Sequence, residues 1–179
     1  MRNVFSLFAA LLWALASASA ALTLPSLGYE AGPGIQAPLG GWSKALGAGP
    51  AFALRVVHPW RPKVAFGLGV GLSQLRGKAD RDLIYRSAPV TARAGYRFLR
   101  MRSEQDLWVW AGAGAQWSQT TLSGGKETSS DPVAEAGLTA SFVLAPPLRI
   151  FLETAYKEVF APRQHGRGVG LGLGLRVGR

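Results

Sequence analysis

Hydrophobic and polar residues alternate along most of the chain with a period of two, which is the pattern of a β-strand with two different faces. The C-terminal segment shows the pattern most plainly, because glycine occupies most of the positions between its apolar residues Val169, Leu171, Leu173, Leu175 and Val177. Glycine is abundant and spread through the chain, and it costs about 1 kcal/mol relative to alanine inside a helix. The chain is therefore predicted to be all-β.

Eight segments alternate in this way and are predicted to form eight strands, at residues 27–35, 46–56, 64–73, 90–98, 107–116, 134–142, 149–157 and 168–178. Short connections, rich in proline or charge, lie at 58–63, 100–106 and 145–147. Mostly longer, polar connections lie at 36–44, 75–82, 119–131 and 161–167. Short turns at one end and longer loops at the other are typical of outer-membrane barrels. The predicted fold is an eight-stranded antiparallel up-and-down transmembrane β-barrel.

Three prolines fall inside or directly beside the predicted strands. Pro33, Pro50 and Pro89 each remove one donor from a strand ladder, and proline is normally confined to strand edges, strand ends and bulges. We interpret these positions as bulges or strand ends within the barrel.

The glycine-rich face decides which side of the strands points into the barrel. A soluble barrel would turn the apolar face inward and leave these glycines in water, where they would pack against nothing. Turned inward, the same glycines relieve crowding in an eight-stranded barrel, whose interior is just wide enough for side chains. We therefore expect Leu68, Val70, Leu171 and Leu173 to face lipid, with Gly69 and Gly170 pointing inward.

Aromatic residues gather near the predicted strand ends, as in the aromatic girdles of membrane barrels. Those expected near the periplasmic ends are Trp60, Phe98, Trp108, Trp110 and Phe142, although Trp108 and Trp110 fall on the glycine-rich face. Those expected near the outer ends are Trp42, Tyr85, Trp117, Tyr156 and Phe160. Together these residues are predicted to form two girdles around an apolar band.

The inward face also collects a charge network, predicted to comprise Glu30, Arg55, Arg93, Arg97, Glu135, Glu153 and Lys157. Unpaired charges are costly in a confined interior of low dielectric, so near balance between the two signs indicates pairing. One interpretation is a structural salt-bridge plug that keeps the barrel closed, and the other is a polar conduit or gate. We expect at least one arginine to pair with one of the glutamates across the lumen and to block a continuous water path, as the plug requires.

Residues 1–20 are predicted to be a cleavable signal peptide, which leaves residues 21–179 as the barrel. A positive start is followed by an apolar run from Val4 to Leu15 and by the small-residue site Ala18-Ser19-Ala20. Export agrees with a location in a bacterial outer membrane. The chain has no cysteine, and His58 and His165 lack the spacing of metal ligands, so neither metal nor cofactor is expected.

The net charge of +10 raises the question of an anionic partner. Basic excess often indicates nucleic acid, but export and the scattered placement of the basic residues argue against it. Membrane lipid is the expected partner, with anionic headgroups or lipopolysaccharide phosphates as counter-charges. The basic segment 75–82 is interpreted as a solvated hairpin end or, alternatively, as a contact to those phosphates.

The residues from Ser26 to Arg179 resemble the small eight-stranded outer-membrane barrels of the OmpA/OmpX type. The resemblance rests on the architecture and on strands such as Phe66-Gly-Leu-Gly-Val-Gly-Leu72 and Val169-Gly-Leu-Gly-Leu-Gly-Leu175. It implies a monomer that the outer-membrane insertion machinery recognises. Such barrels usually end in an aromatic residue, whereas the last five residues here contain none.

Catalytic patterns are weak in this sequence. Glu135 and Glu153 lie among arginines, which favours ion pairing over acid–base chemistry, and Ser118 or Ser123 would need a histidine nearby to act as a nucleophile. The expected function is therefore a non-enzymatic structural or surface-interaction role in the cell envelope. The alternative is a narrow transport conduit for small or hydrophobic solutes, and a lipid-modifying enzyme at the outer rim is a third class.

Overall fold

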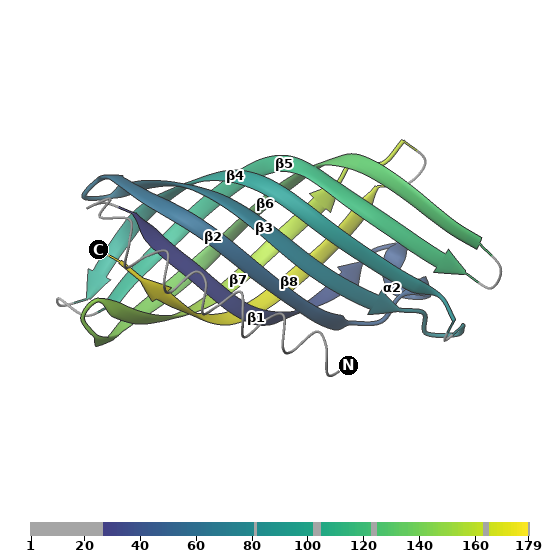
Figure 1. Cartoon of the computed structure of the whole chain (residues 1–179), viewed down its shortest axis with the longest axis horizontal. Helices are drawn as coiled ribbons and strands as arrows, with labels where there is room; N and C mark the ends of the chain where they lie inside the picture. Colours follow the sequence, from purple (N-terminus) through teal and green to yellow (C-terminus); the bar gives the residue numbers. More distant parts are fainter. Residues whose placement is uncertain (1–26, 81, 102–104, 123–124, 163–164, 179) are drawn as a thin grey trace, which may run out of the picture.

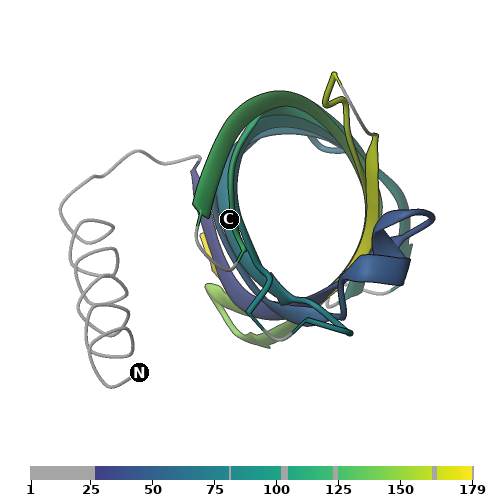
Figure 2. The same ribbon diagram turned by 90° about the vertical axis from the view of Figure 1, so that its right-hand side faces the viewer.

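The structure, a computed structural model, describes residues 27–80, 82–101, 105–122, 125–162 and 165–178. Eight antiparallel strands form a closed barrel in which each strand pairs with the next and β1 pairs with β8 (Figures 1 and 2). The elements are β1 (Gly28–Leu39), α2 (Trp42–Ala45), β2 (Gly49–Arg61), β3 (Val64–Arg76), β4 (Ile84–Met101), β5 (Gln105–Leu122), β6 (Gly125–Ala145), β7 (Leu148–Val159) and β8 (Gly166–Val177). The predicted fold class is confirmed, whereas the predicted signal peptide lies outside the described residues.

The two ends of the barrel differ. The turn end carries the short connections at 62–63 and 146–147, together with the start of β1 and the end of β8. The loop end carries α2 and the connections at 77–83 and 160–165 (right-hand side of Figure 1). Since short turns of such barrels face the periplasm and longer loops face outside, we place the periplasm at the turn end.

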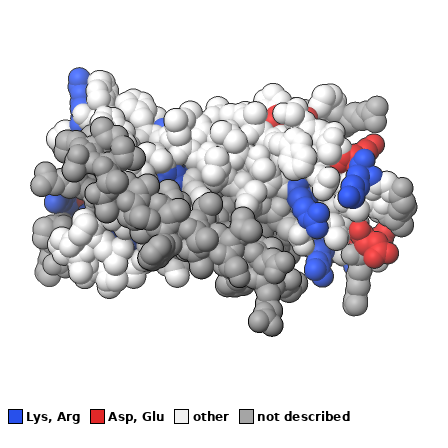
Figure 3. Space-filling view, in the orientation of Figure 1, with Lys and Arg blue, Asp and Glu red and all other residues white. Residues whose placement is uncertain are grey.

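The barrel is inside-out relative to a soluble protein. Leu68, Leu171 and Leu173 point outward with exposed fractions of 66, 56 and 55%. Buried side chains are largely polar or charged and include Glu30 and Gln116. On the face that Figure 3 shows, charged residues gather toward the two ends and leave an uncharged band between them. The outward orientation predicted for the apolar face is confirmed, and such an exterior is suited to hydrocarbon rather than to water.

No helix within the described ranges is long and apolar enough to span a bilayer.

The strands extend further than their apolar patterns predicted. The expected loop at 119–131 is wrong, because β5 continues to Leu122 and β6 begins at Gly125, with paired residues throughout. Figure 1 shows this hairpin projecting at the loop end. Its residues are mainly Gln, Ser and Thr, because a strand that continues beyond the hydrocarbon needs ladder hydrogen bonds but no apolar face. Hydrophobic alternation therefore ends before the strand does.

The beginning of the second strand was also predicted incorrectly. Leu46 and Ala48 precede β2, which begins at Gly49. The backbone N–H of Leu46 instead donates to the Trp42 carbonyl oxygen at 2.8 Å, at the end of α2. Leu46 is buried, so its apolar character reflects packing at the loop end and not a place on the outward face.

The prolines interrupt the sheet less than expected. Pro50 is the second residue of β2, but the interpretation of Pro33 and Pro89 as bulges or strand ends is wrong. Pro33 keeps its pairing with β2, and Pro89 keeps its pairing with β5. Each ladder on the other side skips the proline and resumes in the same register. Proline lacks one N–H but keeps its carbonyl, so only one of the two neighbouring ladders is interrupted.

A charge on the outward face should destabilise the barrel according to its depth. Leu173→Lys places an ammonium in the middle of β8 and should lower the free energy of unfolding by about 2–4 kcal/mol, compared with about 0–1 kcal/mol for Leu39→Lys at the loop end. Urea unfolding of the two variants in phospholipid vesicles measures the difference. Equal tolerance of both lysines would contradict a lipid-facing β8.

Candidate functional site: the barrel lumen

Five charged residues from five strands meet inside the barrel, and we name them the central network: Glu30, Arg55, Arg93, Glu153 and Arg176. The Arg93 guanidinium donates to Glu30 Oε2 at 2.8 Å and to Glu153 Oε2 at 3.1 Å. These two carboxylates belong to β1 and β7, whereas Arg93 belongs to β4. Arg93 therefore links opposite walls of the barrel.

The remaining arginines complete the central network along the wall. Arg55 donates from Nη1 to Glu153 Oε2 at 2.9 Å and also lies 3.6 Å from Glu30. Arg176 donates from Nε to Glu30 Oε1 at 2.7 Å. Glu30 is the register partner of Arg55 in the β1–β2 ladder and of Arg176 in the β1–β8 ladder. Three guanidinium groups thus surround two buried carboxylates, and each carboxylate is shared.

Trp110 supports the central network from β5. Its ring lies 4.6 Å from the Arg93 guanidinium carbon, within the range of a cation–π interaction. Its indole N–H donates to Thr139 Oγ1 at 3.1 Å, and Thr139 in turn donates to Glu153 at 3.1 Å. Buried indole and hydroxyl groups are therefore satisfied by the same network that neutralises the charges.

A second ion cluster lies nearer the turn end. Asp106 accepts from Arg149 at 2.6 Å and from Arg97 at 3.2 Å, and Arg100 lies 3.9 Å away. The Arg97 guanidinium also lies 5.7 Å from the Trp108 ring. Arg97 is thus held near the turn end by Asp106 and Trp108, while the glutamates of the central network are held by other arginines.

A polar chain crosses the lumen nearer the loop end. The Lys157 ammonium donates to the amide oxygens of Gln36 at 3.2 Å and Gln116 at 3.0 Å. The Gln116 amide N–H donates to the Tyr85 hydroxyl at 2.8 Å. These residues come from β1, β7, β5 and β4, so the chain joins opposite walls of the barrel.

An apolar cluster lies beyond this polar chain at the loop end. Leu46, Leu75 and Tyr85 are buried together, and Trp42 and Leu83 pack against them. The rings of Trp42 and Tyr85 meet edge to face with centroids 5.0 Å apart. Leu75 is the inward residue of β3 at this level and is completely buried, so the lumen wall changes from polar to apolar toward the loop end.

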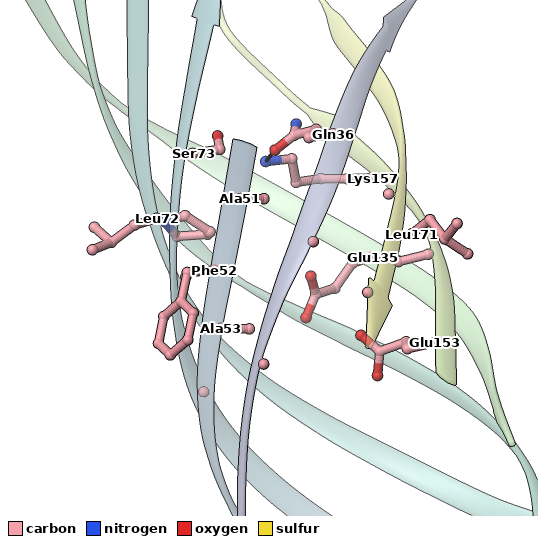
Figure 4. A pocket seen from close by; sticks show the side chains of 18 of the residues that line it. Gln36, Ala51, Phe52, Ala53, Leu72, Ser73, Glu135, Glu153, Lys157 and Leu171 are labelled. Atoms are coloured by element: carbon pink, nitrogen blue, oxygen red, sulfur yellow. Dashed lines mark hydrogen bonds between the residues drawn. The ribbon is translucent and has the colours of Figure 1, made fainter. Parts of the chain in front are cut away.

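A cavity of about 130 Å³ lies between the central network and the polar chain. Arg55 and Glu153 border it on one side, and Gln36 and Lys157 border it on the other. Figure 4 shows Lys157, Glu135 and Glu153 pointing into this space, whereas Phe52, Leu72 and Leu171 point away from it. The cavity therefore has charged and amide groups directed into it, and it is bounded elsewhere by backbone, small side chains and the buried Phe151.

Inward glycines play two different roles. A β-carbon at Gly137 would lie 2.7 Å from the Trp110 ring, and one at Gly174 would lie 2.5 Å from the Phe151 ring. These glycines make room for large lumen side chains. A β-carbon at Gly170 or Gly172 would meet only one backbone oxygen of β1, at 3.7 Å, so these two glycines border open space in the cavity.

The structure separates the residues predicted as one charge network into three groups and leaves Glu135 outside them. Glu30, Arg55, Arg93 and Glu153 come together, Arg97 joins Asp106, and Lys157 joins the polar chain. Glu135 accepts a hydrogen bond from Thr91 Oγ1 at 2.7 Å. The expected contact between an arginine and a glutamate across the lumen is present in the Arg93–Glu30 and Arg93–Glu153 pairs.

The aromatic girdle was predicted only in part. Six of the ten predicted girdle residues have outward, exposed side chains: Trp60, Phe98, Trp117, Phe142, Tyr156 and Phe160. Trp108, Trp110 and Tyr85 instead belong to the lumen, and Trp42 packs in the apolar cluster. The correction has one physical reason: side-chain direction in a strand follows parity, so position near a strand end does not place a residue on the lipid side.

Several lumen residues were missed by sequence reasoning. Arg176 occupies the inward parity of the last strand, and Arg149 occupies that of β7, so parity was a usable signal for both. Asp106 was expected in a turn, and Gln36 in a loop, but both belong to strands that extend further than the apolar pattern. Gln116 is the last residue of the fifth predicted strand, but its neutral side chain gave no indication of a partner.

The candidate catalytic residues are not brought together as pairs. Ser118 Oγ lies 2.8 Å from Ser129 Oγ, whereas the His165 ring contacts Phe160 with centroids 5.8 Å apart. Glu153 is held by arginines and Glu135 by Thr91, as given above. Ser123 lies outside the described residues, and the described residues contain no cluster of three or more His, Asp or Glu suited to a metal ion.

Several solved structures are similar to this barrel in fold. Neisserial surface protein A has a TM-score of 0.68 and 13% identity, covering 86% of this chain and 97% of that protein. Ail of Yersinia pestis has a TM-score of 0.57 and 15% identity, covering 86% of this chain and 99% of that protein. This chain has the fold of the eight-stranded outer-membrane barrels. With its apolar exterior, this fold is that of an integral outer-membrane protein.

The similarity to known proteins is confined to the fold. OprG of Pseudomonas aeruginosa has a TM-score of 0.55 and 10% identity, covering 87% of this chain and 97% of that protein. No protein-family model matches the sequence, and no curated protein matches it either. Identities this low show a shared barrel fold, so the role of this outer-membrane barrel has to be argued from its own lumen and surface.

The two roles of glycine can be separated by substitutions two residues apart on β8. Gly174→Ala should lower the free energy of unfolding by about 1–3 kcal/mol, because the new methyl group overlaps the Phe151 ring and the Ala31 carbonyl oxygen. Gly172→Ala should be neutral or should stabilise by about 0.4–1 kcal/mol through the unfolded chain. Urea unfolding in detergent micelles measures both, and equal losses would contradict the assignment.

Proposed function

We propose that this outer-membrane barrel is non-enzymatic and closed to ions, with a structural or surface-interaction role in the cell envelope. The observation that carries the proposal is the central network, in which Arg93 reaches from β4 to glutamates of β1 and β7. Donor–acceptor distances of 2.8 and 3.1 Å leave no space for a hydrated ion between these groups. An ion would have to separate paired charges in a low-dielectric interior in order to pass.

Two further layers support a closed lumen. The Asp106 cluster lies toward the turn end, and the polar chain from Tyr85 to Gln36 lies toward the loop end. A solute moving along the axis would have to break at least one set of hydrogen bonds in each layer. Shared partners hold these side chains in place, which favours a rigid support over an open channel.

A narrow conduit remains the second candidate, and the cavity of about 130 Å³ favours it. The cavity shows that the lumen is not filled uniformly by side chains. A conduit would require the central network to open, however, whereas a structural barrel requires it to stay closed. Conductance therefore distinguishes the two functions.

Removal of Arg93 should affect stability and conductance together. Arg93→Ala removes the link between β4 and the two glutamates and should lower the free energy of unfolding by about 3–5 kcal/mol, because the remaining charges are left partly unpaired. Wild-type protein in planar bilayers should carry little ion current, and Arg93→Ala should carry more. Urea unfolding and single-channel recording measure the two effects.

Arg167→Ala is the matched control for this experiment. Arg167 is an exposed arginine of β8 that pairs with Glu158 at 3.0 Å outside the lumen. Its removal deletes the same charge but should leave the free energy of unfolding nearly unchanged, because exposed ion pairs contribute little, and it should leave conductance unchanged. Large ion currents in the wild type, together with unchanged stability of Arg93→Ala, would contradict the closed lumen and favour the conduit.

The surface part of the proposal concerns the outward face at the loop end. Arg76 and Arg86 are exposed on adjacent strands, beyond the apolar residues Leu72 and Val90 of the same faces. Arg86 also donates to Gln74 at 3.1 Å, which holds it along the wall. Guanidinium groups at this level are suited to lipopolysaccharide phosphates or other anionic headgroups. In support, Ail of Yersinia pestis is known in complex with the heparin analogue sucrose octasulfate.

Loss of these two arginines should weaken stabilisation by lipopolysaccharide. Adding lipopolysaccharide to phosphatidylcholine liposomes should raise the free energy of unfolding of the wild type. The double variant Arg76→Gln, Arg86→Gln should lose about 1 kcal/mol of this increase per removed charge. Arg61→Gln combined with Lys63→Gln removes two exposed charges at the turn end and is the control. The urea midpoint with and without lipopolysaccharide measures the effect, and an equal loss in the control would contradict a loop-end site.

A further inference from the structure

Two opposite charges in the cavity remain apart although they are cross-strand neighbours. Glu135 of β6 and Lys157 of β7 are register partners, and both line the cavity. Within the described residues, neither has an ion-pair partner within 4.0 Å. Figure 4 shows the Lys157 amine beside Gln36 and the Glu135 carboxylate apart from it, with both side chains extending into the cavity. The two head groups therefore flank the space between them.

Neutral partners hold this separation. Lys157 donates to Gln36 and Gln116, whereas Glu135 accepts from Thr91. Opposite charges attract strongly in an interior of low dielectric, so an unsupported pair on facing positions would close into a direct ion pair. Here amide and hydroxyl groups hold the two head groups apart before a ligand enters.

The floor of the cavity is kept free by glycine. Gly170 and Gly172 have no side chain packed over them, whereas Gly137 and Gly174 lie under aromatic rings. A narrow lumen explains why Gly137 and Gly174 have no side chain, but it does not explain Gly170 and Gly172. The open volume of about 130 Å³ is close to that of a protein cavity, roughly 150 Å³, that holds one benzene molecule. The site therefore admits a ligand with about the number of heavy atoms of a small amino acid.

The charge of the site selects the class of ligand. Glu153 is already held by two arginines, which leaves Lys157 and Glu135 as the charged groups without an ionic partner. A simple anion would satisfy only Lys157, and a simple cation would satisfy only Glu135. We propose that the cavity binds a small zwitterion, with its carboxylate at Lys157 and its ammonium group at Glu135.

This site goes beyond the closed structural barrel and does not depend on passage through it. The central network bars the lumen on the turn-end side of the cavity, so the ligand exchanges through the loop end. Lys157 stands on that side with a long flexible chain, and its displacement opens the polar chain without disturbing the Arg93 bridge. Binding from the loop end and closure to ions are compatible properties of one lumen.

Titration of the folded full-length protein in detergent micelles tests the proposal. Glycine, β-alanine and γ-aminobutyrate serve as probes with increasing distance between the charges, and acetate and ethylammonium serve as single-charge probes. At least one zwitterion should bind saturably in calorimetry, with an affinity about tenfold above that of either single-charge probe, because it gains a second charged hydrogen bond. No saturable binding of any zwitterion would overturn the proposal and indicate a cavity that holds water only.

Variants locate the binding in the cavity. Lys157→Met and Glu135→Gln should each weaken zwitterion binding about tenfold, and Gly172→Val should abolish it by filling the cavity. Arg167→Gln, on the outside of β8, is the control and should leave binding unchanged. Should Gly172→Val fail to fold, Gly170→Ala adds a single methyl group to the same floor and should weaken binding.

The outcomes separate this proposal from the proposed function. Binding that survives both Lys157→Met and Glu135→Gln would overturn the site, whatever the conductance of the wild type. Large ion currents in a protein that binds the zwitterion would instead contradict the closed barrel and leave the site intact.

Discussion

The ion pairs that Arg93 makes with Glu30 and Glu153 are the interaction on which the interior of this barrel depends. Charged side chains are tolerated inside a narrow membrane barrel only when each has partners, since several kcal/mol are needed to remove an ion from water. Here each carboxylate is shared between arginines, and the surrounding Trp110 and Thr139 complete the hydrogen bonds. The position of this network determines what else fits in the lumen.

Glycine sets the shape around the network. Where an aromatic ring or the stem of an arginine must lie against the wall, a glycine faces it, as with Trp110 over Gly137 and Arg55 over Gly69. Where no side chain packs over a glycine, as at Gly170 and Gly172, open volume remains in the lumen. The lumen is therefore a packed middle with a small polar cavity beside it, and both parts follow from where the β-carbons are missing.

Much of this architecture could be predicted from alternation alone. Parity identified eight strands and the lipid face, and it placed Glu30, Arg55, Arg93 and Glu153 inside. Pairing partners could not be predicted, because the network crosses the lumen and depends on the radius and register of the closed barrel. Strand ends were missed where polar residues such as Thr120 and Ser129 continue the ladder outside the hydrocarbon. Trp108 and Trp110 were assigned to the girdle because they lie near a strand end, although their parity places them inward. The structure shows that parity predicts side-chain direction better than position along the strand.

The ladder between β1 and β8 is the seam that joins the two ends of the barrel sequence. It is also the ladder that brings Arg176 to Glu30, two residues 146 positions apart. Every other ladder joins strands that follow one another in the chain. An incompletely zipped sheet would leave Glu30 without Arg176 in an apolar medium, so closing the seam completes the set of three arginines around this carboxylate. Assembly in the membrane is thereby made cooperative, because half-closed forms carry an electrostatic penalty that the complete ring does not.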